Sequence, residues 1–135
     1  MRLYKVEGNS MYPLLRDSDM VVVSPVPVER LKKGTIVVFE ETKGEYIVHR
    51  LVKKTGDGKV ILRGDGYNLP LESAAADAVV GRATGIIRGG RLIRISRTRE
   101  CCFWAVARIK EQVKRLLKER TRIVRQGKMS VSDHP

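Results

Sequence analysis

The sequence has few of the residues that stabilise small proteins by means other than packing. Its 135 residues include only two cysteines and two histidines. Cys101 and Cys102 are adjacent, so a disulfide between them would be strained, and this set of residues is too small to form a Cys/His zinc site. A disulfide framework is therefore excluded, and we expect no metal or other cofactor.

Long apolar runs and aromatic side chains are also scarce. No segment has the roughly 18 consecutive apolar residues of a membrane span, and the N-terminal MRLYKVEGNS lacks the apolar run of a signal peptide. Aromatic residues make up 5% of the chain, which weakens any expectation of base stacking. We expect a protein that is made and kept in the cytoplasm.

Hydrophobic residues at 42% and charged residues at 31% are typical of a water-soluble chain of one domain. The net charge of +12 is distributed unevenly. Residues 1–96 hold 16 Lys and Arg against 11 Asp and Glu, whereas residues 97–135 hold 11 against 4. Such a basic end indicates either an anionic partner or a solvated helix face.

Six short segments rich in valine and isoleucine recur about every ten residues, separated by glycine, proline and charged turns. They are MVVVSPV, GTIVVFEE, EYIVHRLVKK, KVILRGDG, AVVGRATGIIRGG and RLIRIS. TKGEY and KTGDGK are typical of hairpin turns, because glycine adopts the positive φ that tight connections need. We therefore expect a mainly β fold, with a compact β domain over residues 1–96.

After Arg99 the apolar residues recur at steps of three and four, with basic residues between them. This pattern predicts a basic amphipathic helix over residues 97–126, followed by a polar tail over 127–135. The helix could pack its apolar stripe on the β domain, lie on an anionic membrane surface as a peripheral anchor, or contact a partner or nucleic acid. Its first turn, CCFWAVA, fits an interfacial anchor and a buried turn equally well.

Three stretches carry residues with potential chemistry: VEGNSMYPLLRDSDMVVV around Ser10, YIVHRLV around His49 and LRGDGYNLP around Asp65. Each has an ordinary interpretation when it is considered alone. Ser10 fits a polar turn between two strands, and a single histidine in a strand is more often a packed residue than a base. Their order along the chain is the feature that calls for another interpretation.

Gly-x-Ser-Met-x-Pro, the strand GTIVVF, Val-His-Arg and Gly-Asp followed by Asn resemble, in order and rough spacing, the type I signal peptidase and LexA-like serine protease superfamily of S24/S26-like peptidases. The resemblance covers about residues 6–88. Most bacterial members pair the serine with a lysine. His49 makes the chain similar instead to the archaeal and endoplasmic-reticulum signal peptidases, and the resemblance implies Ser10 as nucleophile, His49 as general base and Asp65 as the acidic member.

These residue types suit that chemistry. A hydroxyl attacks an amide only if a base removes its proton, and imidazole titrates near neutrality. A carboxylate on the second ring nitrogen would fix the tautomer. We expect the Ser10 backbone N–H to stabilise the oxyanion, with Gly8 allowing close approach, and Asn9, Met11 and Pro13 completing the oxyanion or substrate site. Met11 and Pro13 fit core packing and a stiff turn equally well.

The acidic residue is the least certain member of the set. GDGYN departs from the tighter Gly-Asp-Asn of the family because Gly66 and Tyr67 are inserted. Glu72 or Asp77 could supply the carboxylate in place of Asp65.

The resemblance implies a serine endopeptidase that cleaves a leader peptide or a protein substrate, bound as an extended strand with small side chains before the cut. Only nine residues precede Ser10, too few for the membrane anchor of signal peptidases, so we expect cleavage on the cytoplasmic side. The sequence has no helix-turn-helix, and nucleic acid is not an expected partner. The competing function is a non-catalytic module that keeps the fold and binds a peptide or an anionic surface.

Overall fold

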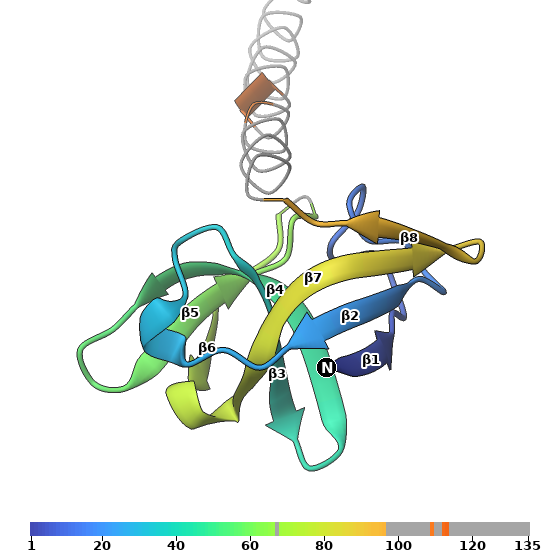
Figure 1. Ribbon diagram of the computed structural model, residues 1–135. Coiled ribbons are helices and arrows are strands. Elements are labelled where there is room, and N and C mark those ends of the chain that lie inside the picture. The colour runs from blue at the N-terminus through green and yellow to red at the C-terminus, as the bar shows by residue number, and fades with distance from the viewer. Residues whose placement is uncertain (67, 97–108, 110–111, 114–135) are drawn as a thin grey trace, which may run out of the picture.

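The computed structural model describes residues 1–66, 68–96, 109 and 112–113 (Figure 1). The predicted helix over 97–126 and the polar tail lie outside the described residues, apart from Ile109, Gln112 and Val113, which have a helical backbone. In the described part of the chain, no helix has both the length and the apolar character needed to cross a membrane.

The described chain forms one antiparallel sheet of eight strands (Figure 1). The strands are β1 (Arg2–Lys5), β2 (Met20–Ser24), β3 (Ile36–Thr42), β4 (Glu45–Lys54), β5 (Lys59–Arg63), β6 (Glu72–Ala75), β7 (Val79–Arg88) and β8 (Arg91–Arg94). Their order is β1-β2-β7-β3-β4-β5-β6, with β8 paired to β7. Two 3-10 turns, η1 (Val28–Arg30) and η2 (Ala76–Ala78), complete the regular structure. The prediction of a mainly β fold is confirmed.

Five of the six predicted segments contain an observed strand in full, and EYIVHRLVKK coincides with β4. The sixth, GTIVVFEE, covers β3 except for Thr42. The edge strands β1 and β6 were not predicted. Both are four residues long, and neither contains valine, isoleucine or threonine, so they lack the composition that marks a strand.

The sheet buries apolar side chains on both of its faces. Successive strand residues point to opposite sides, and β3 shows the consequence directly. Ile36 and Val38 belong to one buried cluster, together with Met11 and Leu15, whereas Val37 and Phe39 belong to another. Because both faces are covered, β2 and β3 have nearly continuous apolar sequences.

In the described part of the chain, one edge of β1 and one edge of the first half of β4 have no partner strand. These two free edges lie near each other. Among the described residues, β1 pairs only with β2, and residues 45–49 of β4 pair only with β3, because pairing with β5 begins at Arg50. The rings of Tyr4 on β1 and Tyr46 on β4 meet across the gap, with centroids 4.9 Å apart. The sheet is thus curled so that these two edges face each other.

Candidate active site

Ser10 lies in the loop that joins β1 to β2, and this loop is firmly closed at its base. The Val6 N–H donates to the Asp19 carbonyl at 2.8 Å, and the Ser18 N–H donates to the Val6 carbonyl at 2.9 Å. Gly8 turns the chain with a φ of +82°, in the left-handed region that favours glycine, and its N–H donates to Asp17 Oδ1 at 2.9 Å. Ser10 itself is partly exposed.

The second half of the Ser10 loop is tied to β7 by a buried carboxylate. Asp19 is 3% exposed and accepts hydrogen bonds from Arg88 Nε at 2.9 Å, Arg88 Nη2 at 2.7 Å and the Arg16 N–H at 2.8 Å. Arg88 Nη2 also donates to the Leu14 carbonyl at 3.0 Å. The hydrogen bonds from Arg88 lower the pKa of the Asp19 carboxyl, because they stabilise its charged form.

His49 lies on β4 with 6% of its surface exposed, and its Nδ1 is 2.8 Å from Glu72 Oε2. Glu72 is the first residue of β6, and its side chain reaches the imidazole across β5, which lies between β4 and β6 and pairs with both. Its side chain is one-third exposed, so the pair lies at the surface of the sheet. With Nδ1 bonded to a carboxylate, the proton on that nitrogen is fixed and Nε2 is the basic nitrogen.

The loop after β5 brings the Ser10 backbone and His49 Nε2 to one point. A methyl group on Gly64 would stand 2.6 Å from the Ser10 carbonyl oxygen and 3.2 Å from His49 Nε2. The Gly66 N–H donates to the same carbonyl at 2.8 Å. Within the described part of the chain, the Ser10 hydroxyl makes no hydrogen bond to His49, and such contacts often form only when substrate is bound.

Asp65 does not contact His49 but forms a two-point ion pair with Arg50. Arg50 Nε and Nη2 lie 2.7 and 2.6 Å from its two oxygens, and Arg50 Nη1 donates to the Gly34 carbonyl at 2.8 Å. The planar guanidinium matches a carboxylate in this way, and a fully buried arginine requires such a partner. The carboxylate at His49 is therefore Glu72, one of the two alternatives, while Asp77 is exposed in η2.

The remaining predicted site residues have structural surroundings of their own. Met11 is 1% exposed and packs in the core, and Pro13 lines a separate groove. Asn9 is exposed and its carbonyl accepts the Tyr12 N–H. Because the Gly8 N–H is bonded to Asp17, the backbone N–H of Ser10 is the remaining expected oxyanion donor.

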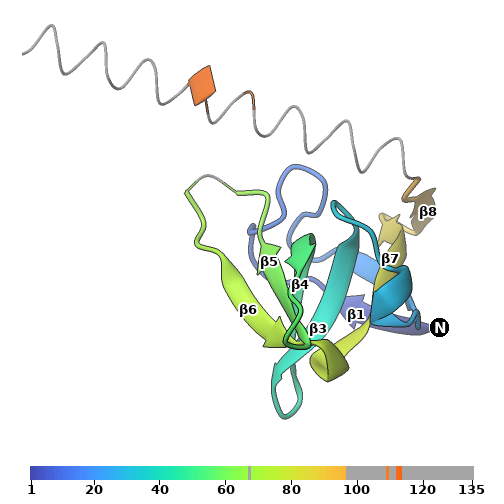
Figure 2. The ribbon, with the colours of Figure 1, turned by 90° about the vertical axis from the view of Figure 1, so that its left-hand side faces the viewer.

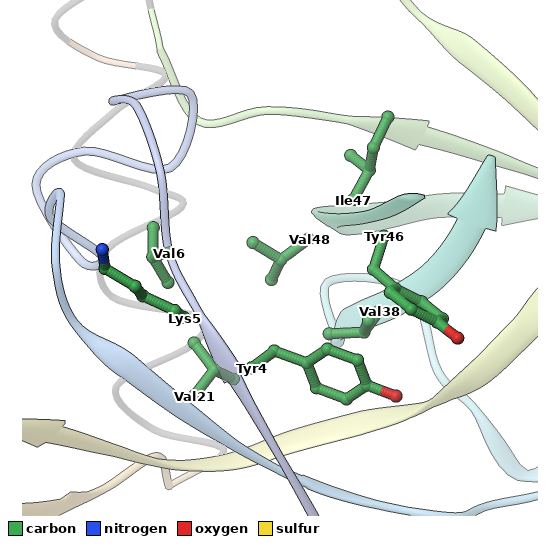
Figure 3. Close-up of a pocket in the computed structure, with 8 residues that line it drawn as sticks. All are labelled: Tyr4, Lys5, Val6, Val21, Val38, Tyr46, Ile47 and Val48. Atoms are coloured by element: carbon green, nitrogen blue, oxygen red, sulfur yellow. The ribbon is translucent and has the colours of Figure 1, made fainter. Parts of the chain in front are cut away.

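A groove of about 180 Å³ lies between the two facing edges of β1 and β4 (Figure 3). Figure 3 shows valine side chains converging on it, with the two tyrosine rings at one end. Its lining residues are Tyr4, Lys5, Val6, Val21, Val38, Tyr46, Ile47 and Val48. Both walls continue along the chain into the site, since β1 leads to Ser10 and β4 continues from Val48 to His49.

The described chain is thus a β fold in which the Ser10 loop lies near a carboxylate-bonded histidine. Among the residues that the structure describes, no group of His, Cys, Asp and Glu is arranged to hold a metal ion. The chain belongs to the Peptidase S24-like family, whose model matches residues 1–80. That match supports the LexA/S24-like superfamily and includes both Ser10 and His49. A comparison with curated proteins gives no match.

Four residues that shape the site were not predicted from the sequence: Arg50, Gly64, Gly66 and Arg88. Arg50 gave one signal, because an arginine inside a buried strand must have a carboxylate partner nearby. The close approach at Gly64 leaves no trace in the sequence beyond the glycine itself.

Proposed function

We propose that the protein is a serine endopeptidase of the Ser/His type, in which Ser10 is the nucleophile, His49 the general base and Glu72 the carboxylate that orients the imidazole. The observation that carries this proposal is the 2.8 Å contact between His49 Nδ1 and Glu72, with Nε2 directed to the point where Gly64 meets the Ser10 backbone. In this assignment Asp65 has a structural role.

The proposed reaction has two steps. The Ser10 oxygen bonds to the scissile carbonyl carbon while its proton passes to His49 Nε2, and the Ser10 N–H stabilises the negative oxygen. The carbon–nitrogen bond then breaks, and the proton on Nε2 goes to the leaving amine. In the second step, His49 Nε2 takes a proton from water and the water oxygen bonds to the acyl carbon. The bond from that carbon to the Ser10 oxygen then breaks, and Nε2 returns the proton to the Ser10 oxygen. Glu72 stabilises the imidazolium that forms in both steps.

The two free edges offer a place for the substrate. An extended peptide between β1 and residues 45–49 of β4 would form main-chain hydrogen bonds to both edges, in the manner of strand addition. Four of the eight residues that wall the groove beneath it are valines, Val21 of the MVVV segment among them. Its volume of about 180 Å³ favours small aliphatic side chains, as in a leader peptide or an extended segment of a protein.

A second candidate function is a peptide-binding module without catalysis. It is favoured by the absence of a hydrogen bond between the Ser10 hydroxyl and His49 in the described part of the chain, and by a groove that needs no chemistry to bind a strand. The two functions share a binding site and differ in the reactivity of Ser10.

Reaction with a fluorophosphonate probe, followed by mass spectrometry of the labelled peptide, separates the two functions. We expect labelling of Ser10 in the wild type, none in Ser10→Ala, and strongly reduced labelling in His49→Ala. Ser18→Ala is the matched control, because Ser18 lies in the same loop, and it should be labelled like the wild type. An unlabelled wild type across neutral and alkaline pH, with lipid present, would favour the binding module.

We further propose that the protein acts in the cytoplasm and associates peripherally with an anionic membrane surface through residues 97–126. The support is the excess of 11 Lys and Arg over 4 Asp and Glu in residues 97–135. Sedimentation with anionic vesicles should show weaker binding for a chain that ends at Ser96 than for the full chain. Equal binding by the two would contradict this proposal.

A further inference from the structure

A second groove lies on the other side of the Ser10 loop. It has a volume of about 240 Å³ and forms where residues 13–16 of that loop meet the hairpin of β7 and β8. Leu14, Ile86, Ile93 and Ile95 give it aliphatic walls, and Ile86 and Ile93 are directly paired across the hairpin. The remaining lining residues are Pro13, Arg16, Arg88 and Arg94.

The charged residues that line this groove are all arginines. Arg88 is bonded to Asp19, which places that carboxylate behind the groove and satisfies it. Arg16 and Arg94 are exposed, and neither has a salt bridge to a carboxylate in the described part of the chain. The groove therefore combines an aliphatic interior with two exposed guanidinium groups at its rim, of which Arg16 also acts on Asp19 through its charge.

The surroundings of the groove are also basic. Ile95 lines it, and the described β unit ends one residue later, at Ser96, where the chain continues into the strongly basic residues 97–135. Figures 1 and 2 place the Ser10 loop and β8 at one end of the molecule and the turn between β3 and β4 at the opposite end. The arginines and the start of the basic segment thus lie at the same end.

We propose that this groove docks the protein on an anionic membrane by binding a phospholipid headgroup. Arg16 and Arg94 pair with the phosphate, since guanidinium forms two-point hydrogen bonds with phosphate oxygens. The aliphatic walls contact the glycerol and first acyl carbons beside it, as apolar side chains do at the interface. The basic continuation favours an extended anionic surface over an acidic peptide, because its charge would add to the attraction. This docking does not depend on the proposed catalysis.

The test compares full-length variants in co-sedimentation with vesicles of phosphatidylcholine containing one-third phosphatidylglycerol. The double variant Arg16→Ala/Arg94→Ala should bind more weakly, by about fivefold for each arginine. Lys43→Ala/Lys53→Ala is the matched control, because it removes the same charge from exposed positions outside the groove, and its binding should fall by less than half as much. The tail is retained in all variants, so its contribution cancels.

Three outcomes would overturn the proposal. Equal losses in the two double variants would show attraction by net charge alone. Full competition by millimolar glycerol 1-phosphate would show a site for free phosphate esters, and binding of an acidic peptide with the same arginine dependence and no vesicle effect would show a protein site. Circular dichroism of each variant checks that the fold is retained, and labelling of Ser10 by the probe reports separately on catalysis.

Discussion

His49 and Arg50 are consecutive residues of β4, and each binds a carboxylate from the segment that follows β5. Because successive strand residues point to opposite faces, the two side chains leave the strand in opposite directions. His49 reaches Glu72, whose side chain is one-third exposed. Arg50 reaches Asp65, and the side chains of this pair are only 2% and 5% exposed.

The buried pair has a structural role, whereas the more accessible pair has the proposed chemical role. The Arg50–Asp65 pair fixes the loop whose Gly66 N–H holds the Ser10 carbonyl at 2.8 Å. It therefore sets the position of the backbone of Ser10, the proposed nucleophile, from inside the protein. The His49–Glu72 pair is more accessible, and its imidazole keeps a nitrogen for proton transfer. One strand thus supplies the proposed base and the support for the loop that carries the nucleophile.

The largest effect is expected on breaking the buried pair. Arg50→Ala leaves Asp65 buried without its counter-ion, and we expect a loss of about 3–5 kcal/mol in the free energy of unfolding, measured by urea denaturation. Lys53→Ala, an exposed position on the same strand, should change it by less than about 0.5 kcal/mol.

A double replacement tests whether the lost stability comes from the unpaired buried charge. Arg50→Met/Asp65→Leu removes both charges and keeps most of the volume, so it should recover much of the lost stability. Recovery of stability without recovery of Ser10 labelling would show that the pair positions the loop. An unchanged stability in Arg50→Ala would contradict the anchoring role.

The opposite result is expected for the His49–Glu72 pair, in which Glu72 is partly exposed. Glu72→Gln should lower the rate of Ser10 labelling by about a hundredfold or more, because the imidazole loses the carboxylate that orients it. Its unfolding free energy should change by less than about 1 kcal/mol, since the pair is partly exposed. Asp65→Asn should instead affect stability first. If Glu72→Gln is labelled like the wild type, Glu72 is not part of the site.

Most of the sheet could be predicted from the sequence because its central strands are rich in valine and isoleucine and are bounded by glycine turns. The edge strands could not. The extended conformation of β1 (RLYK) and β6 (ESAA) depends on pairing with β2 and β5, and their residue types do not predict it. The prediction of a helix over 97–126 remains a prediction.

The site could be predicted in part, through the order of its motifs. Ser10 and His49 were identified as candidates, and the structure brings the backbone of one to the ring of the other through Gly64. The choice between Asp65 and Glu72 could not be made, because it depends on which face of β4 each carboxylate meets. Arg50, whose side chain leaves β4 on the face opposite to His49, binds Asp65.

A smaller effect is expected at Gly64, which lies beside His49 and directly precedes Asp65 in the chain. In Gly64→Ala the new methyl would lie 2.6 Å from a backbone oxygen of Ser10, so the loop must shift. We expect a loss of about 1–3 kcal/mol in stability and at least a tenfold slower labelling of Ser10. Gly56→Ala is the matched control, because nothing lies within 4 Å of its methyl, and it should be neutral or slightly stabilising. Equal behaviour of the two variants would argue against close approach at Gly64.

The smallest effect concerns Asp19–Arg88, the anchor on the other side of the Ser10 loop. Since Arg88 lowers the pKa of Asp19 below the ordinary 3.8, the folded state favours the charged carboxyl. Its contribution is complete above that ordinary value and is lost as pH falls through the lower folded pKa. Asp19→Asn should therefore cost about 1.5 kcal/mol at pH 7 and progressively less on acidification. Urea denaturation across this range measures it, with the exposed Asp77→Asn as control. If the difference in unfolding free energy between wild type and Asp19→Asn stays constant with pH, Asp19 stabilises the loop by packing and not by its charge. It would then differ from the Arg50–Asp65 pair, whose role depends on charge.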